Sequence, residues 1–434
     1  MSLIKAALMV YLFILPLIPG VVEVGIGALP VVTLQRVLLL CILITWLMKK
    51  ASTRQPIPRT PLDRFIVFLV IAEGLAVIVS FNISASSFRL FGDIIEYFAL
   101  YYIVVDMIRS KEDIRKVVTT LLLGSFVAGS FGAAEALTGV NFFRDVLLPN
   151  ADWDWLATYA FALPTGQIFH RGQGVFAHPI EFGHYIILLF PIALVTFNNA
   201  STRWKRYGGL LNLVLLLSNL VATIARGAMV GFLTSLLVLQ SRARRVFVIF
   251  AILLLVILVA GFFAPDYLSS LGDLLLTSFD TGGPSTSANV SLVARLEMAE
   301  AGIQEFIKSP LVGYGFNASR KGLGTDSSFF NPSALYAMEN YYLALLLDGG
   351  LLLFISQTLL YIAIVANMWR VFRRLQSTDE DKDLLMALIA SSLGLFVALL
   401  TVNAYPHILG LFWALVALGM RVVMNQKSRG GDLV

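Results

Sequence analysis

The sequence contains little cysteine and little charge, and each shortage excludes a class of protein. Cys41 is the only cysteine among 434 residues, so neither a disulfide nor a cysteine-ligated metal site can form within one chain. Charged residues make up 14 %, against roughly 25 % in a soluble domain. The net charge of +5 does not indicate nucleic-acid binding, because the basic residues fall in short clusters between apolar runs.

Apolar residues make up 58 % of the chain and are gathered in long runs. A helix needs about 20 apolar residues to cross a hydrocarbon core of ~30 Å. The candidate spans are 5–22, 30–48, 65–82, 90–107, 117–137, 180–198, 208–224, 227–241, 246–264, 340–365, 384–402 and 408–424. No small-x-small cleavage site follows the first run, so we expect it to be retained as a helix. The sequence therefore predicts an all-α polytopic membrane protein of about twelve transmembrane helices, with residues 1–434 forming a single transmembrane domain.

Charge in the connecting segments predicts the orientation of these spans. Most of the 32 lysines and arginines follow every second span, and cytoplasmic loops are the ones enriched in these residues. We therefore expect both termini in the cytoplasm. The basic clusters lie near residue 5 and at 49–64, 109–116, 203–206, 242–245, 370–382 and 421–429.

Two of the outward connections are too long to be simple links. These periplasmic loops are predicted at 138–179 and, larger, at 265–339 between spans nine and ten. In the second loop, Leu292, Leu296, Ala299, Ile303 and Phe306 recur at helical spacing. We expect an amphipathic helix that lies at the membrane interface or caps a chamber.

Arg226 is the only charged residue between 208 and 241, and basic clusters flank that stretch on both sides. Both flanks should be cytoplasmic, yet the stretch is short for two spans of about 20 residues each. We therefore expect a hairpin with its apex at residues 225–227. A guanidinium near mid-membrane is costly and suits an anion-binding cavity, where the following helix N-terminus adds positive charge. A structural ion pair with Asp93 or Glu96 is the alternative.

Further candidate site residues lie in the predicted outer loops. Arg171 precedes the sixth span in a glycine-containing stretch, and Arg295 lies on the amphipathic segment. A surface position is an equally good interpretation for each. Glu339 precedes the tenth span, where it is either a helix-terminal acid or a carboxylate base. The four histidines match no metal-ligand spacing, so no metal site is predicted.

Four segments together resemble the bacterial O-antigen ligase and O-antigen/exopolysaccharide polymerase (Wzy-type) superfamily. They are RGQGVFAHPIEFGHYIILLFPIAL (171–194), TIARGAMVGF (223–232), ARLEMAEAGIQEFIKSPLVGYGF (294–316) and ENYYLALLLDGG (339–350). The resemblance implies a membrane-embedded glycosyltransferase of the bacterial inner membrane that uses no metal or other cofactor. Its donor would be an undecaprenyl-diphosphate-linked oligosaccharide presented at the periplasmic face. Its other partners would be membrane lipid and further polysaccharide-export proteins.

The resemblance also assigns roles to residues of this chain. The basic residues of the family correspond to Arg171, Arg226 and Arg295, which would hold the diphosphate leaving group. Glu339 would be the catalytic base and Asn340 a substrate contact. Ligases resemble one another in a His-Asn pair where this chain has Glu339-Asn340. That departure favours a polysaccharide polymerase over a ligase that transfers the glycan to lipid A-core.

A transporter of lipid-linked glycans is the alternative from another functional class. Such proteins also have about twelve spans, but they tend to contain paired repeats with helices broken at mid-membrane. No internal repeat is visible here, and the two long outer loops differ in length. The sequence therefore favours an enzyme.

Overall fold

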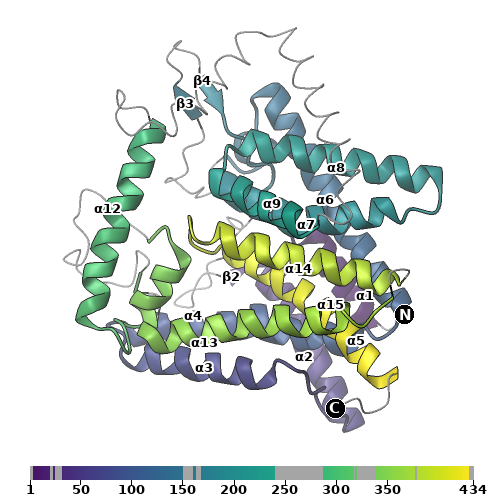
Figure 1. The fold of residues 1–434 in the computed structure, drawn as a ribbon, viewed down its shortest axis with the longest axis horizontal. Coiled ribbons are helices and arrows are strands. Elements are labelled where there is room, and N and C mark those ends of the chain that lie inside the picture. The colour runs from purple at the N-terminus through teal and green to yellow at the C-terminus, as the bar shows by residue number, and fades with distance from the viewer. Residues whose placement is uncertain are drawn as a thin grey trace.

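The computed structural model describes residues 3–19, 23–24, 32–149, 160–162, 168–239, 287–316, 318–319, 338–376 and 379–429, and they are mostly helical (Figure 1). The helices are α1 (Leu3–Ile14), α2 (Leu34–Thr53), α3 (Asp63–Ile78), α4 (Ile83–Asp93), the π-helix η1 (Ile94–Ala99), α5 (Leu100–Met107), α6 (Lys111–Thr138), the π-helix η2 (Phe142–Leu147), α7 (Pro179–Asn198), α8 (Arg203–Thr223), α9 (Arg226–Val238), α12 (Ser287–Lys308), α13 (Tyr341–Phe372), α14 (Glu380–Ala398) and α15 (Pro406–Arg429). Short strands form two antiparallel pairs, β1 (Glu23–Val24) with β2 (Val32–Thr33) and β3 (Ala160–Ala162) with β4 (Ile168–His170).

Local sequence explains where the long helices begin and end. Ser110 and Asp113 form a reciprocal capping box at the start of α6, which satisfies amides that the first turn leaves free. Pro179 occupies the first turn of α7, where its missing N–H is no loss. Gly139 ends α6 in the left-handed region, with φ of 72°.

Five of the described helices are long and apolar enough to cross a membrane, which supports a multi-pass membrane protein. They are Lys111–Thr138, Pro179–Asn198, Arg203–Thr223, Tyr341–Phe372 and Pro406–Gln426. The larger number of about twelve spans stays a prediction. The expected span 246–264 lies outside the described residues.

Polar contacts gather several helix ends at one end of the molecule. Lys5 on α1 forms an ion pair with Asp113 on α6 at 2.8 Å. Asp381 on α14 pairs with Lys111 at 2.9 Å and accepts a hydrogen bond from Gln426 on α15 at 2.9 Å. The starts of α1, α6 and α14 and the end of α15 are therefore neighbours, and several of the predicted basic clusters lie there.

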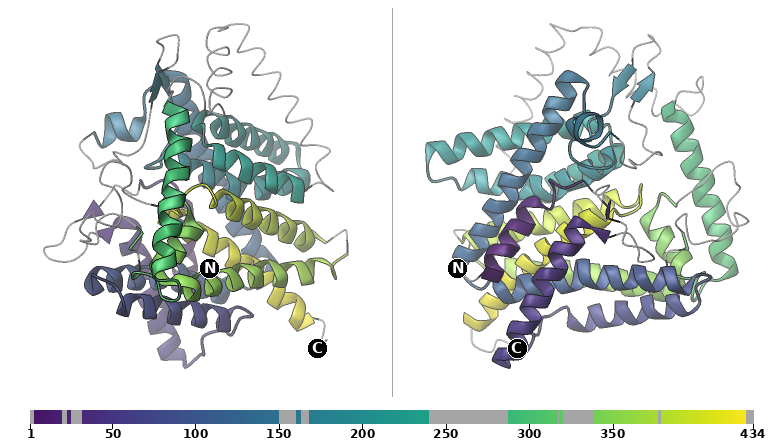
Figure 2. Two further views of the ribbon diagram at one scale, coloured as in Figure 1. Left: turned by 60° about the vertical axis from the view of Figure 1, so that its left-hand side comes forward. Right: turned by 180° about the vertical axis from the view of Figure 1, so that it is seen from behind.

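The helix α12 stands across the other helices, on the side away from the start of α1 and the end of α15 (Figures 1 and 2). It covers the segment predicted to be an amphipathic helix. Leu296 and Ile303 from the predicted apolar stripe remain 60 % and 50 % exposed. Ala299 and Phe306 from the same stripe pack against the start of α13, together with Met298 and Gly302.

A break divides α13 at Gly349–Gly350, where the backbone leaves helical geometry. The connection after α12 pairs with this break, because Tyr314 N donates to Leu347 O at 2.8 Å and Leu351 N donates to Pro310 O at 2.8 Å. Gly350 has φ of 62°, and a Cβ there would lie 2.3 Å from the carbonyl carbon of Leu311. Only glycine fits this close approach.

Candidate active site

Arg171 is fixed against the end of α8. Its side chain is 7 % exposed, and its Nε donates a hydrogen bond to Thr223 O at 2.8 Å. The next residue, Gly172, donates its N–H to Ala222 O at 2.9 Å. A cation predicted in an outer loop is thus held beside the turn between α8 and α9.

A buried carboxylate anchors the loop that carries Arg171. Glu135 on α6 is 4 % exposed and accepts hydrogen bonds from Gln173 N at 2.9 Å and Gly174 N at 2.7 Å. Asn141 adds a third bond, from its Nδ2 to Gly174 O at 2.7 Å. These three hydrogen bonds join the loop to α6 and to the residue before η2, and so they hold it in place.

Arg226 begins α9 directly after the turn from α8. The hairpin expected for 208–241 is observed as α8 and α9, and Ile224 makes the turn in the left-handed region at φ of 49°. Gly227 touches the connection between α14 and α15 so closely that a Cβ would lie 1.8 Å from Thr401 Oγ1. The start of α9 is therefore fixed against this connection.

Arg295 and Glu339 form an ion pair between α12 and the start of α13. Arg295 Nε lies 2.5 Å from Glu339 Oε2, and the two side chains are 27 % and 42 % exposed. Beside them Glu339 N–H donates to the sulfur of Met298 at 3.0 Å, while Met298 and Met338 pack together. The acid that the sequence singled out is thus paired with one of the arginines.

Asn340 is the N-cap of α13. Its side-chain oxygen accepts from Leu343 N at 3.0 Å, and its Nδ2 donates to Leu400 O at 2.8 Å. Tyr341 N–H adds a bond to Leu399 O at 3.1 Å. Both polar ends of the Asn340 amide therefore have structural partners, and the substrate contact expected of it stays a prediction.

The three arginines lie close enough for their charges to act on one another. Arg171 experiences the charges of Arg226, Arg295 and Glu339, and Arg226 experiences that of Arg295. The pKa of Arg171 is lowered to about 10, chiefly by burial, while the charges of Arg295 and Arg226 also lower it and those of Tyr405 and Glu339 raise it. The guanidinium still carries its proton at neutral pH. Arg171, Arg226 and Arg295 are called the arginine cluster below.

The connection between α14 and α15 brings three helix starts together. Its Thr401 touches the start of α9, and its Leu399 and Leu400 accept hydrogen bonds from the start of α13. Tyr405 lies against His178 at the start of α7, with ring centroids 5.7 Å apart. Helix N-termini carry partial positive charge and bind anions, so they reinforce the arginine cluster.

His178 also lies at this site, although no role was predicted for it from the sequence. Its Nδ1 accepts the N–H of Ile180 at 3.0 Å as the N-cap of α7. Burial lowers its pKa to about 3, and the charges of Arg171 and Arg295 contribute. The neutral ring therefore carries its proton on Nε2 and can donate a hydrogen bond. The sequence feature that could have indicated this position is a histidine directly before Pro179, because a proline at the start of a helix marks the preceding residue as its N-cap.

A second contact secures the same connection to α7. Glu181 is 3 % exposed, and its Oε1 lies 3.3 Å from His407 Nδ1. Its Oε2 accepts from Ala177 N at 3.3 Å. Within the described residues, no group of three or more His, Cys, Asp or Glu side chains is placed to hold a metal ion.

The two acids suggested as alternative partners of Arg226 are engaged with other arginines. Asp93 pairs with Arg89, one turn earlier, at 3.1 Å, and Glu96 pairs with Arg36 on α2. The alternative role of Arg226 as the partner of one of these acids stays a prediction.

The comparisons with known proteins concern the segment that carries most of this site. Residues 211–358 match the family model described as O-antigen ligase, which covers about a third of the chain. The matched segment contains Arg226, Arg295 and Glu339 but ends before the α14–α15 connection and begins after Arg171. No curated protein matches the chain. The resemblance of this protein to the O-antigen ligase and polymerase superfamily of membrane glycosyltransferases is therefore confirmed across residues 211–358.

Proposed function

We propose that this protein is a membrane-embedded polysaccharide polymerase. It transfers a glycan from an undecaprenyl-diphosphate donor to a sugar hydroxyl of a lipid-linked acceptor at the periplasmic face of the bacterial inner membrane. The observation that carries the proposal is a chain of contacts between the segments that bear the arginine cluster and Glu339. Arg171 bonds to Thr223 just before Arg226, and Gly227 touches Thr401. Asn340 bonds to Leu400, and Arg295 pairs with Glu339.

Charge at the site suits a lipid diphosphate. Three arginines and one glutamate carry a formal charge of +2, and a diphosphate diester carries about two negative charges. Guanidinium groups bind phosphate oxygens through paired N–H donors without a metal ion. The site therefore matches the leaving group of a lipid-linked glycan.

The proposed step moves one glycosidic bond. The oxygen of the acceptor hydroxyl bonds to the anomeric carbon of the donor, and the bond from that carbon to the diphosphate breaks. The electron pair of the broken bond stays on the diphosphate oxygen, where the arginine cluster stabilises it. Glu339 takes the proton of the hydroxyl as general base.

The ion pair between Arg295 and Glu339 has a place in this step. While the site is empty, Arg295 neutralises Glu339. A bound diphosphate competes for the guanidinium, and the carboxylate that Arg295 releases can then accept the proton of the acceptor hydroxyl. Donor binding thus activates the base only when a leaving group is present.

A ligase is the nearest alternative, since it needs the same donor site. The Glu339-Asn340 pair in place of the His-Asn pair of ligases favours the polymerase. A transporter of lipid-linked glycans is less well supported, because the family match is to glycosyltransferases.

One reconstitution distinguishes these functions. Purified full-length protein in liposomes is given a lipid-linked oligosaccharide alone, and products are resolved by size. A polymerase produces a ladder of products that differ by one repeat. Product only after lipid A-core is added would establish a ligase, and unchanged oligosaccharide under both conditions would contradict both enzymes.

A further inference from the structure

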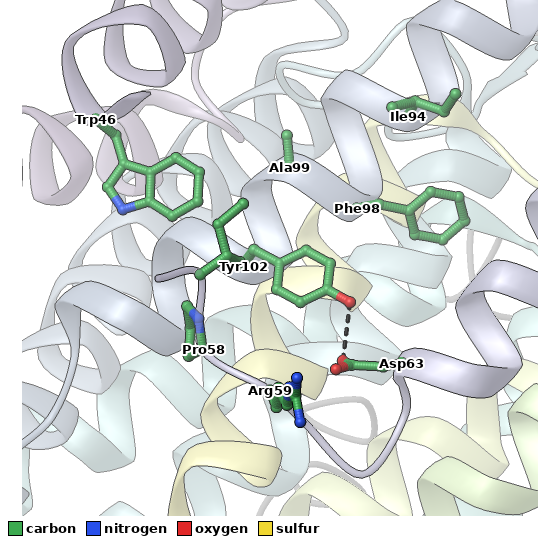
Figure 3. A pocket seen from close by; sticks show the side chains of 9 residues that line it. Trp46, Pro58, Arg59, Asp63, Ile94, Phe98, Ala99 and Tyr102 are labelled. Atoms are coloured by element: carbon green, nitrogen blue, oxygen red, sulfur yellow. Dashed lines mark hydrogen bonds between the residues drawn. The ribbon is translucent and has the colours of Figure 1, made fainter. Parts of the chain in front are cut away.

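A cavity lies among α2, the α2–α3 connection and the continuous helix formed by η1 and α5, and none of the arginine cluster lines it (Figure 3). Its volume is about 450 Å³, within the range of pockets that hold small ligands. Asp106, next to the cavity wall, is bonded to Arg109, whose carbonyl accepts from Asn425 on α15. The cavity is therefore at the end of the molecule where the basic clusters gather.

One wall of this cavity is held by a buried acid. Trp46 is 2 % exposed, and its Nε1 donates to Asp106 Oδ2 at 2.8 Å. Lys50 pairs with the same carboxylate at 2.8 Å and donates to Pro56 O at 3.1 Å. Asp106 thus fixes the indole and, through Lys50, the connection that overhangs the cavity.

The opposite wall carries one acid, Asp63, and one cation, Arg59, and they differ in how many bonds to the protein they already form. Asp63 accepts from Tyr102 OH at 2.9 Å and from both the N–H and the hydroxyl of Thr60. Three donors therefore already use its oxygens. Arg59 is exposed and forms no ion pair with any residue that the structure describes. The guanidinium is the group left to bind a ligand.

The back wall is an apolar stripe. Ile94, Phe98 and Tyr102 follow one another at four-residue spacing on η1 and α5, a length of about 12 Å. On α3, apolar side chains on the side of Asp63 are exposed, such as Val67, one turn later, at 56 %. In a membrane protein these surfaces face lipid, so the cavity opens toward acyl chains.

We propose that this cavity binds one anionic phospholipid. Arg59 binds the phosphate, and an acyl chain lies along Phe98 and Ile94. Basic pockets between membrane helices on the cytoplasmic side bind anionic headgroups, and tryptophan and tyrosine concentrate at the headgroup level. The proposal is independent of the glycosyltransferase function.

Native mass spectrometry of the purified full-length protein tests the proposal with phosphatidylglycerol and phosphatidylethanolamine as probes. The wild type should retain one phosphatidylglycerol per chain, with about tenfold preference over phosphatidylethanolamine, because the ammonium group of phosphatidylethanolamine offsets the negative charge of the phosphate that Arg59 binds. Arg59→Gln should lose most of that preference. Lys49→Gln, which removes an exposed positive charge outside the cavity wall, should keep it.

A second variant tests the apolar half of the site. Ala99 lines the cavity, so Ala99→Phe fills it while Arg59 remains, and retention of the lipid should fall by a similar factor. The melting temperature of each variant without added lipid shows whether it is folded. Equal losses in Arg59→Gln and Lys49→Gln, or equal retention of the two lipids by the wild type, would overturn the proposal.

Discussion

At the scale of single residues, a substitution of Glu339 can show whether its carboxylate is the proposed base or only a structural ion-pair partner of Arg295. Glu339→Gln keeps the shape of the side chain but removes its ability to accept a proton, so we expect chain extension to fall by about 10²- to 10⁴-fold. Product ladders from lipid-linked oligosaccharide measure this. Glu305→Gln on α12, which breaks the ion pair with Lys308, is the matched control and should retain activity. Full activity of Glu339→Gln would exclude the proposed base.

His178 should make stability depend on pH in the acidic range. Its pKa is lowered to about 3 in the folded protein, so the unfolded chain binds more protons between about pH 3 and pH 6.5. Stability is therefore complete above about pH 6.5 and falls toward pH 3, by at most about 1.4 kcal/mol per pH unit from this group.

The variant His178→Asn tests this dependence, because asparagine also caps helices well. Its melting temperature should fall less than that of the wild type between pH 6.5 and pH 4. An identical fall in both proteins would show that other groups are responsible.

The members of the site could be found in the sequence more easily than their arrangement. Arg226 can be identified from the sequence because a single cation inside a long apolar stretch is costly in a membrane and therefore indicates a function. Its proximity to Arg171 and Arg295 depends on loop contacts such as Glu135 with Gln173, which link residues far apart in the chain. No local pattern encodes such contacts, and for the same reason the role of His178 was missed.

At the scale of elements, the contact between α9 and the α14–α15 connection can be tested by a double-mutant cycle. Gly227→Ala places a methyl group within 1.8 Å of Thr401 Oγ1, so it should lower both melting temperature and activity. Thr401→Ala removes that oxygen, and the double variant should recover part of the loss. We expect a coupling energy of about 0.5–3 kcal/mol. Additive effects would show that the two elements are not in this contact.

The break in α13 should tolerate no side chain. Gly350→Ala combines a positive φ with a collision against the backbone of Leu311, which we expect to cost about 1–3 kcal/mol or more. Gly208→Ala on α8 is the matched control, because a Cβ there meets nothing within 4 Å. Alanine should be neutral or stabilising at that helical position. The melting temperatures of the two variants test this prediction. Equal values would show that an alanine at position 350 causes no backbone strain.

The sequence predicted where helices lie better than it predicted where a helix is broken. The span expected at 180–198 is observed as α7, Pro179–Asn198, because the proline and the apolar run mark it locally. The span expected at 340–365 is longer and broken at Gly349–Gly350. That break exists to receive the connection after α12, and such packing between distant segments leaves no periodic signal.

At the scale of the whole molecule, the predicted orientation can be measured by labelling single cysteines. Cys41→Ser gives a background without thiols, since the chain has no other cysteine. Lys308→Cys on α12 should react with a membrane-impermeant maleimide in intact spheroplasts. Arg203→Cys at the start of α8 should react only after the membrane is permeabilised. The reverse pattern would invert the proposed topology.

The α14–α15 connection also determines when during synthesis the enzyme becomes active. A ribosome completes the arginine cluster and Glu339 before it makes residues 399–405, which receive the starts of α7, α9 and α13. A nascent chain therefore carries all of its reactive groups while they are still unassembled. Under the proposed function, we therefore expect glycosyl transfer to begin only after the last two helices have entered the membrane, so that unfinished chains consume no donor.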